Sequence, residues 1–333
     1  MESFIRYSIV GVMRDTILFG DCRETLKQFD EKARMCVTSP PYYGLRDYGG
    51  EEKQIGLEQT PEEYINQMVE VMRLVRNNLT DDGTLWLNIG DSYYNYKSGT
   101  GEYAKQSFSK TRQDLPMRNP KRANRLKGFK DKELMGIPWM LAFALRADGW
   151  HLRQDIIWNK PNPMPESVKD RCTKAHEYIF LLTKERDYYY DNEAIKEPVK
   201  QDWGTRDRSK GKYHNEGTGL QPHSGLTKSY TKKNKRSVWT VNKKPYKGAH
   251  FATFPAELIE PCIKAGSEVG DIVLDPFMGS GTTAAVAKSL GRDYIGCELH
   301  ENYGNLIQKR VNEYKPVEEV SHKGLNPLQD LLY

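Results

Sequence analysis

Short apolar runs alternate with amphipathic stretches along most of this chain. The apolar runs have the length of strands, and the amphipathic stretches repeat their apolar positions near every 3.6 residues. The pattern predicts strands over 16–19, 33–37, 84–89, 152–158, 178–183, 272–274 and 294–297, and helices over 23–29, 61–78, 137–148 and 284–290. Such alternation predicts an α/β protein with a doubly wound, mostly parallel, Rossmann-like sheet.

The clearest helix signal begins at Pro61, directly after Thr60. Proline suits the first position of a helix because the amide it lacks has no partner there, and threonine suits the capping position before it. Apolar side chains then follow at helical spacing as far as about residue 78. We expect Asp81, Asp82 and Gly83 to end this helix.

Two polar segments interrupt the alternation. Residues 92–132 hold 11 Lys+Arg against 3 Asp+Glu with interleaved aromatic residues, which predicts a mobile basic loop. Residues 196–247 hold 14 Lys+Arg against 4 Asp+Glu, although the whole chain carries a net charge of only +5. Both segments fit solvated surface, but their shared positive charge and their aromatic residues favour contact with nucleic-acid phosphates.

The composition excludes several other classes of protein. The five cysteines form no Cys-x-x-Cys pair, and an odd number argues against a disulfide framework, so we expect a reducing, cytoplasmic location. The seven histidines show no metal-ligand spacing, so no metal is expected. We see no secretory signal and no run of 18 apolar residues, so a membrane partner is not expected either.

The first chemical motif is Ser39-Pro40-Pro41-Tyr42, which follows the strand predicted over 33–37. The two prolines remove two backbone donors and hold Ser39 in an extended conformation. The Ser39 hydroxyl and the Pro40 carbonyl can then converge as hydrogen-bond acceptors for an amino group, and Tyr42 offers a ring face for stacking. Ser-Pro-Pro is also an ordinary start of a loop.

The second motif lies at 275–281 and reads Asp-Pro-Phe-Met-Gly-Ser-Gly, between a predicted strand and a predicted helix. Gly279 and Gly281 permit positive φ and a close approach of the backbone to a ligand at the helix N-terminus. Glu298 ends another predicted strand about 20 residues later, the spacing at which an acidic side chain receives ribose hydroxyls. The loop lacks the Gly-Lys-Ser/Thr of P-loop nucleoside triphosphatases, so we predict that it binds a ribose-bearing cofactor other than a nucleoside triphosphate.

Together these two motifs resemble those of the β-class DNA amino-methyltransferases, which use S-adenosyl-L-methionine. Further matching pieces lie at 18–22, 83–91, 175–180 and 250–255, and the resemblance covers roughly 13–312. The motif order is circularly permuted, with the catalytic motif first. The resemblance implies a catalytic half over 13–190, an inserted basic target-recognition region over 191–247, a cofactor-binding half over 248–315 and a C-terminal tail over 316–333.

The resemblance also implies roles for individual residues. Ser39, Pro40, Pro41 and Tyr42 would hold the target base. The cofactor would be held by Asp21 near its adenine ring, by Glu298 at its ribose, and by Asp275, Phe277, Gly279, Ser280, Gly281, Thr282 and Phe254. We expect Arg46, Lys232, Lys233, Lys235 and Arg236 to contact DNA.

The expected reaction is methyl transfer to an exocyclic amine of a base flipped out of double-stranded DNA. In the resembled family, serine before Pro-Pro-Tyr favours cytosine N4, and adenine N6 is the alternative. C5 methylation is disfavoured because Tyr42, and not a nucleophilic cysteine, follows the prolines. An RNA methyltransferase and an inert nucleic-acid-binding module are the other interpretations. A cognate restriction endonuclease and a homodimer are the further partners that the resemblance suggests.

Overall fold

The computed structural model of the protein describes residues 13–44, 53–94, 126–199, 231–242 and 254–314. The strands are β1 (Thr16–Phe19), β2 (Ala33–Thr38), β3 (Leu79–Ile89), β4 (His151–Asn159), β5 (His176–Thr183), β6 (Glu197–Pro198), β7 (Lys232–Lys233), β8 (Val238–Thr240), β9 (Ile272–Asp275) and β10 (Asp293–Glu298). The helices are α1 (Cys22–Thr25), α2 (Pro61–Asn78), α3 (Ile137–Ala147), α4 (Ala256–Gly266), α5 (Thr282–Ser289) and α6 (Gly304–Glu313). Short 3-10 turns lie at Leu26–Gln28, Glu193–Ile195 and Glu301–Tyr303.

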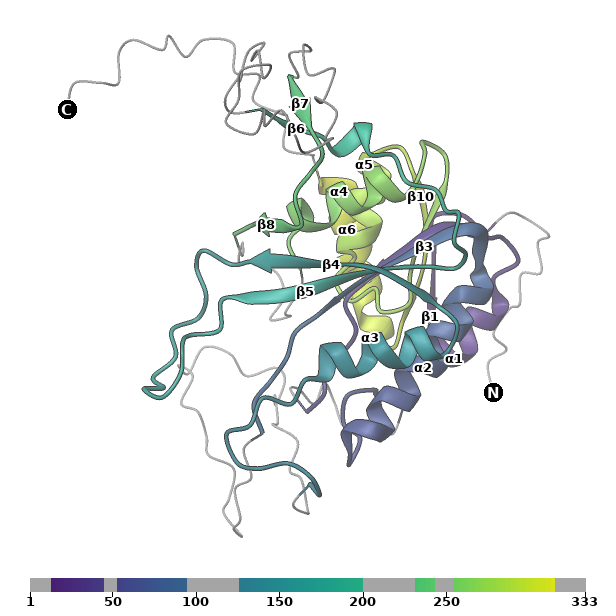
Figure 1. Cartoon of the computed structure of the whole chain (residues 1–333). Coiled ribbons are helices and arrows are strands. Elements are labelled where there is room, and N and C mark those ends of the chain that lie inside the picture. The colour runs from purple at the N-terminus through teal and green to yellow at the C-terminus, as the bar shows by residue number, and fades with distance from the viewer. Residues whose placement is uncertain (1–12, 45–52, 95–125, 200–230, 243–253, 315–333) are drawn as a thin grey trace, which may run out of the picture.

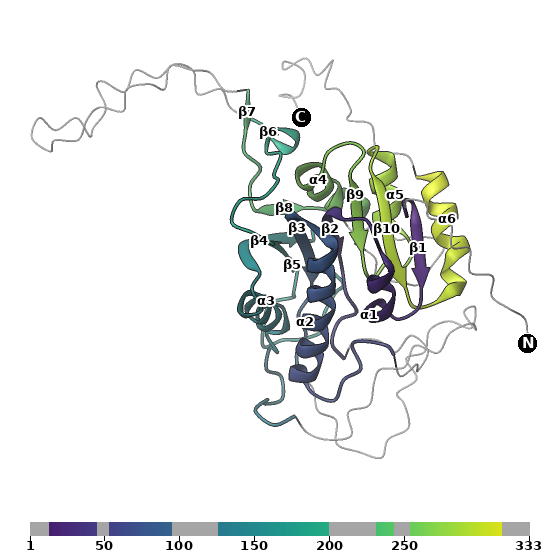
Figure 2. The ribbon, with the colours of Figure 1, turned by 90° about the vertical axis from the view of Figure 1, so that its right-hand side faces the viewer.

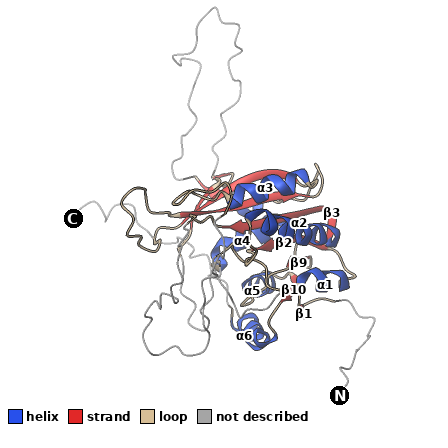
Figure 3. Cartoon of the chain, turned by 90° about the horizontal axis from the view of Figure 1, so that it is seen from below, coloured by secondary structure: helices blue, strands red, loops and turns tan. Residues whose placement is uncertain are grey.

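The main sheet, drawn in Figure 1, has eight strands in the order β1-β10-β9-β2-β3-β5-β4-β8, all of which are labelled in Figure 2. All of its pairings are parallel except those of β5, which is antiparallel to both β3 and β4. Helices lie on both sides of the sheet (Figure 3). The predicted α/β class with a doubly wound, mostly parallel sheet is therefore confirmed.

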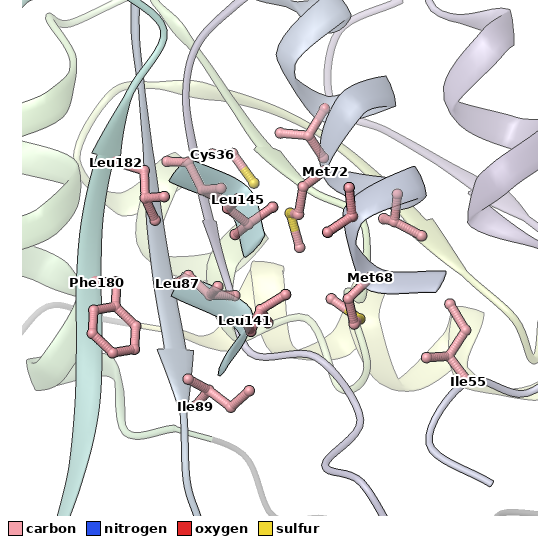
Figure 4. Packing of buried hydrophobic residues seen from close by; sticks show 14 of the residues in the cluster. Cys36, Ile55, Met68, Met72, Leu87, Ile89, Leu141, Leu145, Phe180 and Leu182 are labelled. Atoms are coloured by element: carbon pink, nitrogen blue, oxygen red, sulfur yellow. The ribbon is translucent and has the colours of Figure 1, made fainter. Parts of the chain in front are cut away.

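Two apolar cores form because successive residues of a strand point to opposite faces of the sheet. In β3, Leu85 and Leu87 pack with α2 and α3, whereas Trp86 between them packs with α4 on the other face. Figure 4 shows Met68 and Met72 of α2 in the first of these cores. Central parallel strands covered on both faces explain why the sequence showed continuous apolar runs rather than strict alternation.

Helix α2 begins and ends where the sequence predicts, but the residues after it form a strand. Thr60 accepts a hydrogen bond from the Glu63 amide and Glu63 accepts one from the Thr60 amide, a reciprocal capping box, with Pro61 at the first position. The helix ends at Asn78 as predicted, but residues 81–83, expected to form the stop, lie within β3, which starts at Leu79. These residues lie between the β3–β2 pairs at Leu79 and Thr84, where the register shifts, and Asp82 forms an ion pair with Arg34 of β2.

Other elements match the sequence pattern with small shifts. The helix predicted over 23–29 is split into α1 and a 3-10 turn, and Asp21 caps α1 through the Arg23 amide. Trp150 and Trp158 are buried, and Trp139 packs against the first core. Helices α4 and α6 were not predicted.

The described part of the 191–247 segment joins the main body. The β8 strand extends the main sheet beside β4, and Trp239 within it is buried.

Among the described residues, no helix is both long enough and apolar enough to cross a bilayer. The same residues contain no cluster of three or more His, Cys, Asp or Glu side chains arranged for a metal.

Candidate active site

The two motifs meet because β2 and β9 are neighbouring parallel strands, so their carboxyl ends finish at the same edge of the sheet. Met35 pairs with Val273 and Cys36 with Leu274 in this register. A cavity lies at that edge. Its lining includes Ser39, Pro40, Pro41 and Tyr42 from the first motif, Asp275, Phe277, Gly279 and Thr282 from the second, and Asp21, Phe254 and Glu298.

The Ser39–Tyr42 loop is held in place from several sides. Pro40 is buried, and Ser39, Pro41 and Tyr42 are half-buried. The Tyr64 hydroxyl of α2 donates to the Pro41 carbonyl at 2.9 Å, and the Tyr42 hydroxyl donates to Glu177 Oε2 at 2.8 Å. Burial and the Glu177 charge raise the pKa of Tyr42 well above its usual value, against a smaller lowering by its hydrogen bond with Ser39. The phenol is therefore a donor at neutral pH.

Asp275 joins the two motifs. Its buried carboxylate accepts hydrogen bonds at 2.6 Å from both Thr38 at the end of β2 and Thr283 of α5. The Phe277 amide donates to it as well, at 3.0 Å. Burial raises the pKa of Asp275 to about 6 despite these bonds. The side chain thus ties the strand that carries Ser39 to the loop and helix of the second motif.

Glu298, at the end of β10, supports the glycine turn. It is 7% exposed, and it accepts the Gly279 amide at 2.7 Å and the His300 amide at 3.0 Å. Burial raises the pKa of Glu298 to about 7. The buried carboxylate keeps lone pairs for further donors at the wall of the cavity.

The two glycines of the second motif have different surroundings. Gly279 has φ +54°, and a Cβ atom built there would meet only the Phe277 carbonyl, at 3.9 Å. Gly281 has φ +80°, and its Cβ would lie 2.8 Å from Ile307 Cγ2 and 3.1 Å from Ile307 Cα. Gly281 therefore gives room to α6. Neither it nor Ser280, whose hydroxyl accepts from Arg310, lines the cavity.

Asp21 and Phe254 reach the cavity from other elements. Asp21 follows β1, and although burial acts to raise its pKa, hydrogen bonds from Arg23 hold it below its usual value. The Arg23 guanidinium lies 2.6 Å from Asp21 Oδ2. Phe254 precedes α4 and is 7% exposed.

Among the described residues, none of those predicted to contact DNA lines the cavity. Lys235 and Arg236 form ion pairs with Glu197 at 3.7 and 3.2 Å, and Lys232 and Lys233 form β7 beside β6. Figure 2 shows β6 and β7 beyond the end of the sheet opposite to the end where β9 and β10 finish. Arg46 lies outside the described residues. Their contact with DNA stays a prediction.

Sequence reasoning missed part of the cavity and its support. Lys53, Gln54 and Ile55 line the cavity, and so do His300 and Tyr303, which follow β10. No periodicity or motif marks residues 53–55. Glu177 lies in a piece of sequence that shares the family resemblance, but its contact with Tyr42 depends on β5 pairing with β3.

Comparison with known proteins defines the class. Residues 33–309 match the profile of the N6_N4_Mtase family, described as DNA methylase. The Type II methyltransferase M.XycI of Xanthomonas campestris pv. cyanopsidis is 46% identical over 305 residues, 90% of this chain and 89% of that protein. The chain belongs to this family of DNA methylases, whose methyl donor is S-adenosylmethionine. It is a DNA methyltransferase of the amino class, acting on cytosine N4 or adenine N6.

Solved structures agree on the fold. The cytosine-N4-specific PvuII DNA methyltransferase superposes with a TM-score of 0.55 at 18% identity, over 90% of this chain and 93% of that one. The complex of M1.HpyAVI with S-adenosylmethionine gives a TM-score of 0.51 at 19% identity, over 89% of this chain and 98% of that one.

Proposed function

We propose that this chain transfers the methyl group of S-adenosylmethionine to N4 of a cytosine flipped out of duplex DNA. The observation that carries the proposal is the single cavity shared by Ser39 and Pro40 on one wall and by Gly279 and Glu298 on another. Because both motifs line one cavity, a base amine and a ribose-bearing methyl donor can meet there.

The second motif suits the methyl donor. Gly279 leaves open space beside its backbone, and the Glu298 carboxylate is poised to accept ribose hydroxyls. Asp21, Phe254 and Phe277 supply the polar and aromatic surroundings of a nucleoside. When bound, S-adenosylmethionine supplies an electrophilic methyl group on a positively charged sulfur.

The first motif suits the amine. An exocyclic amino nitrogen has its lone pair delocalised into the ring, so it is a weak nucleophile until its hydrogens are held out of the ring plane. Ser39 Oγ and the Pro40 carbonyl can accept those two hydrogens. The same oxygens stabilise the positive charge that grows on the nitrogen, and the fixed loop orients the amine. Stacking on Tyr42 offsets part of the cost of flipping the base, which is a few kcal/mol.

Cytosine is favoured over adenine by one feature of the sequence, the serine that precedes Pro40. Adenine N6 is the second candidate, because a hydroxyl and a carbonyl suit either amine. The Type II methyltransferases among the relatives further support a role in modifying DNA beside a restriction endonuclease. A homodimer stays a prediction.

The proposal is tested by mapping and by mutation. Purified protein is incubated with duplex DNA and S-adenosylmethionine labelled on the methyl group, and the modified nucleosides are identified by mass spectrometry. N4-methylcytosine supports the proposal, N6-methyladenine would replace cytosine with the second candidate, and unlabelled DNA would refute methyl transfer. Ser39→Ala should lower kcat by about 100-fold without changing cofactor affinity. Ser289→Ala, at the end of α5, is the matched control and should behave as wild type.

A further inference from the structure

A buried polar cluster lies next to the cavity, between the strands that carry the two motifs. It consists of Thr38 at the end of β2, Asp275 at the end of β9 and Thr283 in the first turn of α5. These residues are 0%, 1% and 0% exposed, and Asp275 alone of the three lines the cavity. Neither threonine touches the space where the substrates meet, so any part they take in the reaction comes through Asp275.

The backbone pairing between β2 and β9 ends before it reaches the motifs. The last described pair of this ladder is Cys36 with Leu274, two residues before Thr38. On its other side Thr38 pairs with Leu87 of β3, which holds the end of β2 in the sheet. The separation between the two loops that follow β2 and β9 is therefore set by side chains.

One oxygen atom of Asp275 links the two loops. Asp275 Oδ1 accepts the Thr38 hydroxyl at 2.6 Å and the Phe277 amide at 3.0 Å. Thr38 is the residue directly before Ser39, and Phe277 lines the cavity within the second motif. The same oxygen thus joins the start of the amine-binding loop to the backbone of the cofactor loop.

The second oxygen of this carboxylate is held from the helix side. Asp275 Oδ2 accepts the Thr283 hydroxyl at 2.6 Å, and that hydroxyl also lies 3.5 Å from the Val37 carbonyl. Charge-assisted hydrogen bonds to both oxygens leave the carboxylate little freedom to rotate. The bonds from Thr38 and Thr283 match in length and burial, but only the one from Thr38 leads directly into the Ser39 loop.

Methyl transfer depends strongly on the relative position of these loops. Direct displacement needs the amine nitrogen, the methyl carbon and the sulfur nearly in line, and a misplacement of about 1 Å can cost roughly 100-fold in rate. Ser39 and Gly279 follow different strands, so neither loop can fix this alignment alone.

We infer that Thr38, through Asp275 Oδ1, holds the amine-binding loop at the working distance and angle from the cofactor loop. Thr38 is a positioning residue in this scheme, and Asp275 has a role besides lining the cofactor site. The inference rests on the proposed function, because the alignment matters only if an amine held at Ser39 receives the methyl group.

The test compares Thr38→Val with Thr38→Ser in the full chain. Valine keeps the shape of threonine without the hydroxyl, whereas serine keeps the hydroxyl and loses the methyl group. The readout is the single-turnover rate of methyl transfer to a duplex carrying the mapped target, with saturating S-adenosylmethionine and well below the Tm of each variant. Affinity for S-adenosylmethionine without DNA, and for DNA with S-adenosylhomocysteine, is measured in parallel. If the valine variant fails to fold, Thr38→Ala against Thr38→Ser isolates the same hydroxyl.

Thr38→Val should lower the single-turnover rate about tenfold or more, while both affinities stay within about twofold of wild type. Thr38→Ser should keep the rate within about threefold of wild type, because it retains the hydrogen bond. A residue that acted only through packing would give the opposite order, since serine loses the buried methyl group and valine keeps it.

Two other threonines serve as controls. Thr183→Val removes a similarly buried hydroxyl, which donates to the Glu185 carbonyl at 2.8 Å, and should keep the wild-type rate. Because β5 runs antiparallel to β3, Thr183 at its end lies at the edge of the sheet opposite to the cavity. Thr283→Val removes the other 2.6 Å hydrogen bond to Asp275, so it should lower the Tm about as much as Thr38→Val but lower the rate less.

Three results would overturn the inference while leaving the proposed function intact. In the first, wild type methylates DNA and Thr38→Val does so at the same single-turnover rate. In the second, Thr38→Ser is as slow as Thr38→Val, which would assign the effect to packing. In the third, Thr283→Val is as slow as Thr38→Val, which would assign it to the carboxylate and not to the link between the loops. A wild-type protein that methylates no DNA would overturn the proposed function itself, and the inference with it.

Discussion

Gly279 and Gly281 of the second motif, together with Gly270 before β9, allow the surroundings of the cofactor loop to be tested by three matched substitutions. All three positions have positive φ, namely +87° at Gly270, +54° at Gly279 and +80° at Gly281. Alanine at any of them costs roughly 1–2 kcal/mol of backbone strain. The positions differ in what the added methyl group meets.

At Gly270 a Cβ atom has no neighbour within 4 Å, so Gly270→Ala measures the backbone strain alone. At Gly279 the methyl group meets only the Phe277 carbonyl at 3.9 Å, and the residue lines the cavity. Gly279→Ala should therefore cost the same stability as Gly270→Ala and, in addition, weaken cofactor binding about tenfold or more by occupying space at the cavity wall.

At Gly281 the methyl group would lie 2.8 Å from Ile307 Cγ2 and 3.1 Å from Ile307 Cα, so α6 must shift. Overpacking of this kind adds about 1–3 kcal/mol to the backbone strain. We expect a total destabilisation of about 3 kcal/mol, which lowers the Tm of a domain this large by roughly 6 °C. Changing Ile307 to alanine removes Cγ2 but not Cα, so rescue should be partial.

Thermal unfolding without cofactor and calorimetric titration with S-adenosylmethionine measure the two effects separately. The reasoning is refuted if Gly281→Ala is as stable as Gly270→Ala yet binds the cofactor more weakly. That result would mean that the glycine makes room for the cofactor and not for α6.

Three further predictions concern the same structure. Burial raises the pKa of Glu298 from 4.5 to about 7, so the cofactor-free protein should lose stability as the pH rises between these values. The affinity for S-adenosylmethionine should rise over the same range, because ribose hydroxyls donate best to the ionised carboxylate. Titration calorimetry at several pH values should show this rise in wild type and a flat profile in Glu298→Gln. Gly90→Ala should lower kcat about tenfold with unchanged cofactor affinity, because its methyl group would displace Tyr42, and normal turnover would contradict that packing argument. Replacing Lys232 and Lys233 with glutamine should make the slope of log K for DNA binding against log salt concentration shallower by about 0.9 for each phosphate that these lysines neutralise in wild type. An unchanged slope would show that β7 stays in solvent.

Much of the fold could be predicted from local chemistry. The start of α2 follows from Thr60, Pro61 and Glu63, because a capping box and an N-terminal proline depend only on residues close together in the chain. The central strands follow from apolar runs, because a parallel sheet buried on both faces needs them. The end of α2 near residue 78 also follows from the sequence, but the inclusion of residues 81–83 in β3 could not be predicted, since it depends on the pairing of that strand with β2 at Leu79 and Thr84.

The amino-acid sequence alone specifies which residue types are present for the chemistry: a serine and a rigid proline pair after one strand, a glycine turn after another, and an acid after a third. Their spatial relations come from the tertiary fold. In the fold, β2 lies beside β9, and Gly281 packs against Ile307 of α6. Lys232 in β7 lies beyond the far end of the sheet, and Glu177 accepts a hydrogen bond from Tyr42. The difference is one of range, because caps, turns and strand propensities act within a few residues, whereas strand order and the contacts between β2, β5 and β9 join segments that are distant in the chain and are fixed by burial of the whole core.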